Sequence, residues 1–197
     1  MTSMIFLFVC AGLSFNLILY FGLGLQSITL SEEKSSALSL PFFQAGVLFA
    51  SVLILWLILT FLLPFLAFGF IEYFLLFPFS VLVCVGVEYL SVQVIPSLIP
   101  DKKHFSADTG YNGLVFASLF LTLQLAEDIF SALVLSLSFA LGTLLTMFLL
   151  HYIHKRSILE AVPANIRGRP LMLITLGLLS LIFSSLTTIF FKILEVF

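Results

Sequence analysis

Charged residues are scarce in this chain, because Asp, Glu, Lys and Arg together make up only 9% of its 197 residues. In a typical soluble domain they make up about a quarter, so an ordinary soluble globular protein is excluded. Positive charge is not in excess either, since the formal net charge is −2. A nucleic-acid partner is excluded for that reason, because no basic face is present to neutralise phosphates.

Cysteine is nearly absent: Cys10 and Cys84 are the only two, and both lie in apolar segments. They do not form the spaced pairs of a familiar metal motif, and we interpret them as small buried hydrophobic side chains. A glycine-rich nucleotide loop, a catalytic triad and a zinc motif are also missing from the sequence. We therefore predict no catalytic residue and no metal ligand.

Long apolar runs are what the chain has in abundance, with 61% of its residues hydrophobic. A helix needs about 20 apolar residues to cross a bilayer. The first run lacks a basic start and a cleavage site, so we treat it as mature sequence rather than a signal peptide. The sequence predicts an all-α integral membrane protein with one membrane domain, residues 1–197. Six transmembrane helices are expected at roughly 4–25, 42–66, 72–94, 112–126, 129–151 and 171–193.

The basic residues predict the orientation of these spans. Seven of the eight basic residues fall in the loops after spans one, three and five, and the exception is Lys192. Basic residues favour cytoplasmic loops, so we expect those three loops in the cytoplasm and both termini on the outer side. The residues are Lys34, Lys102, Lys103, Lys155, Arg156, Arg167 and Arg169.

Two of the six spans are irregular. Gly22 and Gly24 interrupt the first, and "TGYNG" (residues 109–113) leads into the short fourth. Three spans per half make the second half run in the opposite direction, so the sequence predicts two inverted three-helix repeats, about 1–98 and 99–197. Broken or half-length helices at corresponding positions point to a midplane site between such repeats. The alternative is that these small residues only let helices pack closely.

Polar side chains inside the spans are few. Glu88 lies about one or two turns from the inner end of span three, and an intramembrane carboxylate is a candidate functional group. The alternatives are that it reaches the interface or is satisfied by a neighbouring helix. His151 and His154 could share a metal at i, i+3 spacing, or they simply belong, with Lys155 and Arg156, to a solvated helix end beside lipid headgroups.

The last third of the chain contains a specific pattern, and its likeness extends over essentially the whole chain, although spans two and five match mainly in hydrophobicity. Its elements are Val162-Pro163, Arg167-Gly168, Leu173-Ile174-Thr175, Gly177-Leu178, Ser180-Leu181 and Phe183, with Asn16, Leu23-Gly24-Leu25, Lys34, Glu88, Pro96 and Asn112 before them. This pattern resembles the A/E-type membrane subunits of the Rnf electron-transport complexes and the related Nqr sodium-pumping NADH:quinone reductases. The six spans and the outer termini are also similar to the Rnf A protein, whose position in the complex is the one favoured for this chain.

The resemblance implies a non-catalytic component of an ion-translocating oxidoreductase complex in the bacterial inner membrane. In this family such a component pairs with a partner of the same fold (Rnf E or Nqr D) that is inserted the other way up. Their broken helices together hold one [2Fe–2S] cluster at the membrane midplane, with two cysteines from each protein. Electron transfer is coupled to movement of Na⁺ or H⁺, and other members of the complex carry flavins and further iron–sulfur clusters.

The chain departs from this family at both cluster positions. Gln26 stands where the first family cysteine is expected, and Gly113 stands where the second is expected. An iron–sulfur cluster needs thiolate or imidazole ligands, which neither residue supplies. We therefore expect that this chain alone binds no cofactor and that the cluster is absent or held in another way. The alternative function is a redox-silent small transporter or scaffold on the same inverted-repeat fold.

Overall fold

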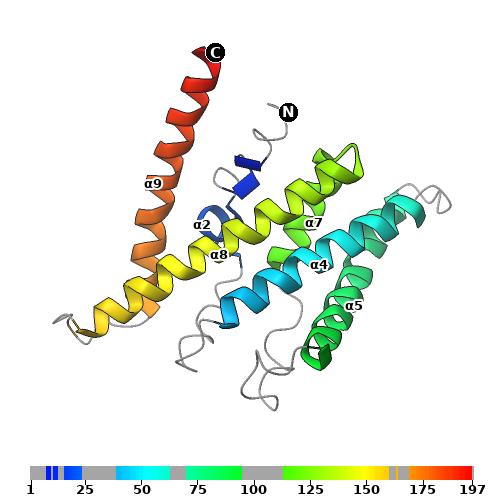
Figure 1. Ribbon diagram of the computed structural model, residues 1–197, viewed down its shortest axis with the longest axis horizontal. Coiled ribbons are helices and arrows are strands. Elements are labelled where there is room, and N and C mark those ends of the chain that lie inside the picture. The colour runs from blue at the N-terminus through cyan, green and yellow to red at the C-terminus, as the bar shows by residue number, and fades with distance from the viewer. Residues whose placement is uncertain are drawn as a thin grey trace.

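The computed structural model describes residues 8–9, 11–12, 16–23, 39–62, 70–94, 113–159, 163 and 169–196. Within these ranges the chain is helical and contains no strand (Figure 1). The helices are α2 (Leu17–Phe21), α4 (Ser39–Leu62), α5 (Phe70–Val94), α7 (Gly113–Leu125), α8 (Ile129–Leu159) and α9 (Arg169–Val196). The prediction of an all-α protein is confirmed for the described part of the chain.

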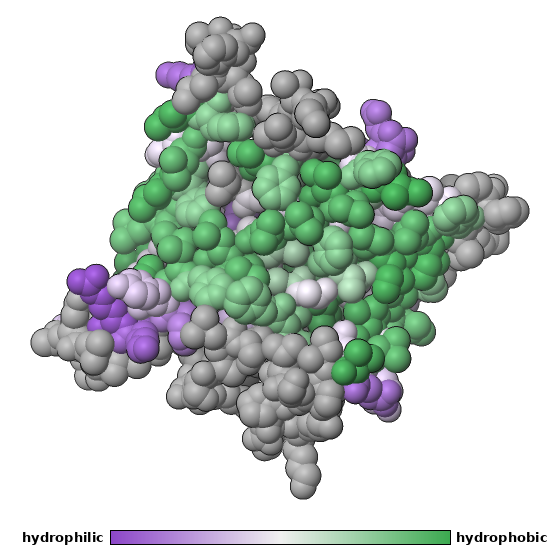
Figure 2. All heavy atoms as spheres, in the orientation of Figure 1, coloured by the Kyte–Doolittle hydropathy of each residue, from purple (hydrophilic) through white to green (hydrophobic). Residues whose placement is uncertain are grey.

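Three of these helices are long and apolar enough to cross a membrane. Their apolar stretches are Pro41–Phe61, Ile129–Ile153 and Pro170–Phe190, while α5 and α7 contain shorter ones, Leu76–Ser91 and Gly113–Leu125. Hydrophobic side chains cover the middle of the face shown in Figure 2, and hydrophilic ones lie at its edges. The chain is therefore membrane-embedded. Helices α4 to α9 overlap the second to sixth predicted spans, whereas most of the first predicted span lies outside the described residues.

Helices α4 and α8 run side by side in opposite directions through the centre of the molecule (Figure 1). Phe42 near the start of α4 meets Phe148 near the end of α8 edge to face, with ring centroids 5.4 Å apart. Deeper in this interface, Val52 and Leu135 are fully buried. Close packing of long apolar side chains along both helices thus forms the main core of the fold.

The other helices surround this central pair. Leu55 and Leu59 of α4 form a second buried cluster with Leu76 of α5 and Leu119 of α7. Helix α9 lies at the outside, since only 11% of its apolar stretch is buried, against 44% for α4 and 56% for α8. Its exposed leucines and isoleucines are suited to lipid contact.

Buried hydroxyl groups in these helices bond to their own backbone. Ser51 Oγ donates to the Val47 carbonyl at 2.6 Å, Ser118 Oγ to Val115 at 2.9 Å and Thr122 Oγ1 to Ser118 at 2.7 Å. A bilayer offers no water to such groups, so each must be satisfied within the protein. These bonds let small polar residues occupy apolar helices without a desolvated, unpaired hydroxyl.

Candidate functional site

The first predicted span is broken where the sequence places its glycines. Helix α2 has only five residues and ends at Gly22, whose φ of 64° is left-handed. The Gly22 amide donates to the Ile18 carbonyl at 3.0 Å, and the Leu23 amide reaches back to Leu17 at 3.3 Å. Glycine adopts a left-handed φ without steric cost, so this closure ends the helix sharply. Helix α2 therefore ends at one of the two glycines that interrupt the predicted span, while Gly24 lies outside the described residues.

Asn16 begins this short helix and fastens it to α8. Its side chain is almost completely buried, with 2% exposed. The Asn16 amide nitrogen donates to the Gly142 carbonyl at 3.0 Å and to Thr146 Oγ1 at 2.8 Å, and its oxygen accepts from the Leu19 amide at 3.4 Å. One side chain therefore caps α2 and joins it to the middle of the longest helix.

The backbone before α2 lies directly against α8. A Cβ built on Gly142 would stand 2.6 Å from the Gly12 carbonyl oxygen, and one built on Gly12 would stand 2.9 Å from Ser138 Oγ. The Ser138 hydroxyl donates to the Phe8 carbonyl. Small residues thus permit an approach that any Cβ at position 142 would obstruct.

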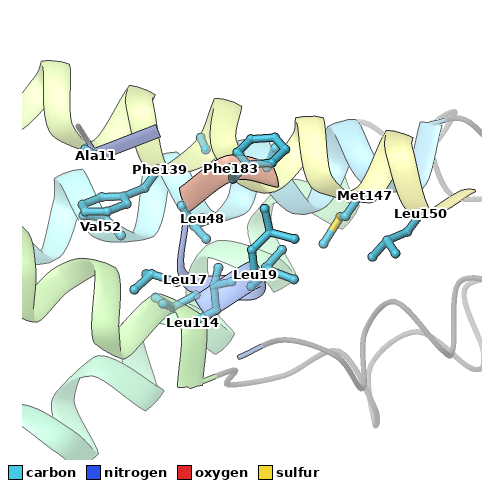
Figure 3. Close-up of a cluster of buried hydrophobic side chains, with 14 of the residues drawn as sticks. Ala11, Leu17, Leu19, Leu48, Val52, Leu114, Phe139, Met147, Leu150 and Phe183 are labelled. Atoms are coloured by element: carbon cyan, nitrogen blue, oxygen red, sulfur yellow. The ribbon is translucent and has the colours of Figure 1, made fainter. Parts of the chain in front are cut away.

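The end of α2 meets the start of α7. A Cβ on Gly113, the first residue of α7, would lie 3.4 Å from Leu23 Cδ2. Buried side chains of both helices belong to one cluster, which includes Leu17, Leu19 and Leu114 (Figure 3). The two irregular elements that the sequence singles out are therefore neighbours in space.

The lengths of α7 and α8 relate this contact to the apolar stretch of α8. Helix α7 has 13 residues and measures about 20 Å at 1.5 Å per residue, short of the roughly 30 Å of hydrocarbon. Only residues 126–128 connect it to α8, so Gly113 lies at about the height of Gly142. Gly142 is in turn near the centre of the apolar stretch Ile129–Ile153. Asn16, which bonds to Gly142, shares this level.

The other two predicted site residues, Gln26 and Glu88, are not seen at the contact between α2 and α7. Gln26 is outside the described residues. Glu88 is on α5 and only 8% exposed; it follows by one turn Cys84, whose thiol lies beside the Ser51 side chain of α4. The hydrogen bonds of Asn16 go to α2 and α8, so they do not join Glu88 to the α2–α7 junction.

The basic end of α8 is a separate feature. His151 is exposed there, and the side chain of His154 lies outside the described part. Among the described residues, no three His, Cys, Asp or Glu side chains gather into a group able to hold a metal.

The Asn16 network is the part of the site that the sequence patterns do not reveal. Its partners are 126 and 130 positions away, and the only local signal is an amide residue inside an apolar run just before a glycine break. No protein-family model and no curated protein sequence matches this chain.

Proposed function

We propose that this chain is an integral membrane component of an Rnf-type, ion-translocating oxidoreductase complex, in the position that the Rnf A protein holds. The observation that carries the proposal is the contact between the end of the five-residue α2 and the start of the 13-residue α7. Broken helices that meet at the midplane are expected where two inverted repeats form a membrane site. The resemblance noted in the sequence assigns its two cluster positions to Gln26 and Gly113, which stand at these two breaks in the sequence.

The residues at the junction do not fit a [2Fe–2S] cluster. Gly113 has no side chain, and Gln26 offers an amide where a thiolate is needed. The described thiol, Cys84, is buried on α5 beside Ser51 of α4. We therefore assign no electron-transfer step to this chain. Its role in the complex is to supply the membrane fold and the contacts with a partner of the same fold.

Glu88 is the proposed ion-path residue. A carboxyl group that is 8% exposed on an apolar helix is costly to bury in a membrane, and such residues commonly serve ion or proton movement. Cys84, one turn earlier on α5, lies near both Glu88 and Ser51 of α4. The transported ion would be Na⁺ or H⁺.

The proposed location is the bacterial inner membrane, with both termini on the periplasmic side. Helix α8 supports this direction, since Glu127 and Asp128 precede it and Lys155 and Arg156 lie near its other end. Basic residues favour the cytoplasmic end of a span. The loop after α8 is then cytoplasmic and the α7–α8 connection is periplasmic.

Purification of the chain from its native membrane tests the proposal. The complex should be extracted in a mild detergent, and its members identified by mass spectrometry together with iron and acid-labile sulfide analysis. We expect a same-fold partner together with flavoprotein and ferredoxin-like proteins, and no cluster ligated by this chain. Isolation of the chain without any redox partner would contradict the proposal and favour the small transporter or scaffold. A midplane cluster bound by this chain would overturn the ligand argument.

A further inference from the structure

The end of α8 continues past the apolar layer into a basic patch. Helix α8 has 31 residues and measures about 46 Å, longer than the roughly 30 Å of hydrocarbon, and its apolar stretch ends at Ile153. Beyond this point, Lys155 and Arg156 are exposed. Figure 2 shows hydrophilic side chains gathered at lower left, where Figure 1 places this helix end. The two cations therefore stand on helical backbone just beyond the apolar stretch.

An exposed apolar strip leads along α8 to this patch. At 3.6 residues per turn, positions 141, 145, 148 and 152 fall on one face of the helix. Leu141 is 46% exposed, Leu145 41% and Tyr152 65%. Lys155 and Arg156 follow one turn later, on either side of the line that these residues define. The strip thus passes from leucine through aromatic residues to two cations.

Helix α4 contacts α8 beside this strip, at the end of the strip that lies closest to Lys155 and Arg156. Phe148 of α8 meets Phe42 of α4 edge to face, and Phe42 is itself 53% exposed. The aromatic pair lies about two turns before Lys155, inside the apolar stretch that ends at Ile153, and Tyr152 lies between this pair and the two cations. Aromatic side chains such as Tyr152 are favoured at the membrane–water interface because they are apolar at one end and polar at the other.

We propose that this surface binds an anionic phospholipid of the leaflet in which α8 ends. An acyl chain lies along Leu141, Leu145 and Phe148, the glycerol region rests against Tyr152, and the phosphate faces Lys155 and Arg156. The order of apolar, aromatic and cationic side chains along α8 matches the order of groups in such a lipid, and the charges are complementary. A zwitterionic lipid also fits the apolar strip, but its headgroup has no net charge for the two cations. This inference does not depend on the proposed redox complex.

Lipid binding to the purified protein tests the proposal. The probes are phosphatidylglycerol and phosphatidylcholine of equal chain length, added to the detergent-solubilised full chain and measured by native mass spectrometry. A basic side chain near an anionic surface contributes about 1 kcal/mol, which corresponds to about a five-fold change in binding. We expect a preference for phosphatidylglycerol that falls about five-fold in Lys155→Gln and further in the double variant with Arg156→Gln. The matched control is Lys192→Gln, an exposed cation near the end of α9, which should keep the preference.

The wild-type protein alone can overturn the proposal. Equal binding of the two lipids would show that the cations do not select the headgroup. Displacement of phosphatidylglycerol by millimolar inorganic phosphate would show a site for a free anion instead of a lipid. Loss of the preference in Lys192→Gln, or its full retention in the double variant, would place the lipid elsewhere. Retention of the preference in Lys155→Arg is expected, since that change keeps the charge.

Discussion

Replacing Gly142 by alanine tests the packing that places the broken helix. A Cβ at this position would stand 2.6 Å from the Gly12 carbonyl oxygen and 3.3 Å from the Gly12 carbonyl carbon and Cα. These are backbone atoms, which cannot rotate aside as a side chain can. The segment around Gly12 must therefore move away from α8, and Asn16, only four residues later, is drawn with it.

The cost follows from three contributions. Overpacking of this kind costs about 1–3 kcal/mol, and strain on the two Asn16 bonds to α8 adds about 0.6 kcal/mol for each bond lost inside a membrane. Alanine has a higher helix propensity than glycine, which offsets about 1 kcal/mol of this loss of stability. We expect Gly142→Ala to lower the free energy of unfolding by about 1–3 kcal/mol.

Gly177 supplies the matched control. It lies within α9, and a Cβ built there meets no atom within 4 Å. Gly177→Ala should therefore be neutral or stabilise the protein by about 0.5–1 kcal/mol. Both variants can be unfolded by SDS titration in mixed micelles and followed by fluorescence of Trp56, the single tryptophan, which is buried in α4. If Gly142→Ala unfolds at the same SDS fraction as Gly177→Ala, the close approach of residue 12 to α8 is refuted.

Three further predictions concern the site residues. Asn16→Ala removes the cap of α2 and both hydrogen bonds to α8, so it should lower the free energy of unfolding by about 2–3 kcal/mol in the same titration. The control is Thr188→Ala, which removes only an exposed hydrogen bond within α9 and should change stability by less than about 0.5 kcal/mol. Gly113→Cys should fold with near-normal stability, because its Cβ would make an ordinary 3.4 Å contact with Leu23; a loss above about 1 kcal/mol would contradict this geometry. Glu88→Gln should impair ion-coupled activity of the purified complex in proteoliposomes while leaving its assembly intact, and unchanged coupling would remove Glu88 from the ion path.

Hydropathy predicted most of the helices because membrane burial is a local property of the sequence. The predicted and observed bounds agree closely for α5, where 72–94 became Phe70–Val94, and for α7, where 112–126 became Gly113–Leu125. The fifth span was predicted at 129–151, and helix α8 continues beyond it to Leu159. The pattern there detected the end of the apolar layer, whereas polar residues such as Lys155 continue the helix into the headgroup region.

Tertiary contacts were not predictable in the same way. The break at Gly22 has a local cause, a residue that tolerates a left-handed φ, and the sequence indicated it. The choice of Gly142 and Thr146 as partners of Asn16 depends on how α2 lies against α8, which no local pattern encodes. The buried position of Glu88 was one of the alternatives that the sequence left open, and the structure places the residue inside the protein.

Cross-linking within the native membrane tests most directly the claim that the two broken helices meet. Leu23→Cys and Gly113→Cys should be combined in a chain whose Cys10 and Cys84 are replaced by alanine, and treated with a short thiol cross-linker. The control pairs Gly113→Cys with a cysteine at Leu181, which is 67% exposed on α9. The 23–113 pair is predicted to form an intramolecular link and the 181–113 pair none. Each of the two cysteines should first be shown to react with a monofunctional thiol reagent. If the 23–113 link then fails to form, the claim that α2 meets α7 is contradicted.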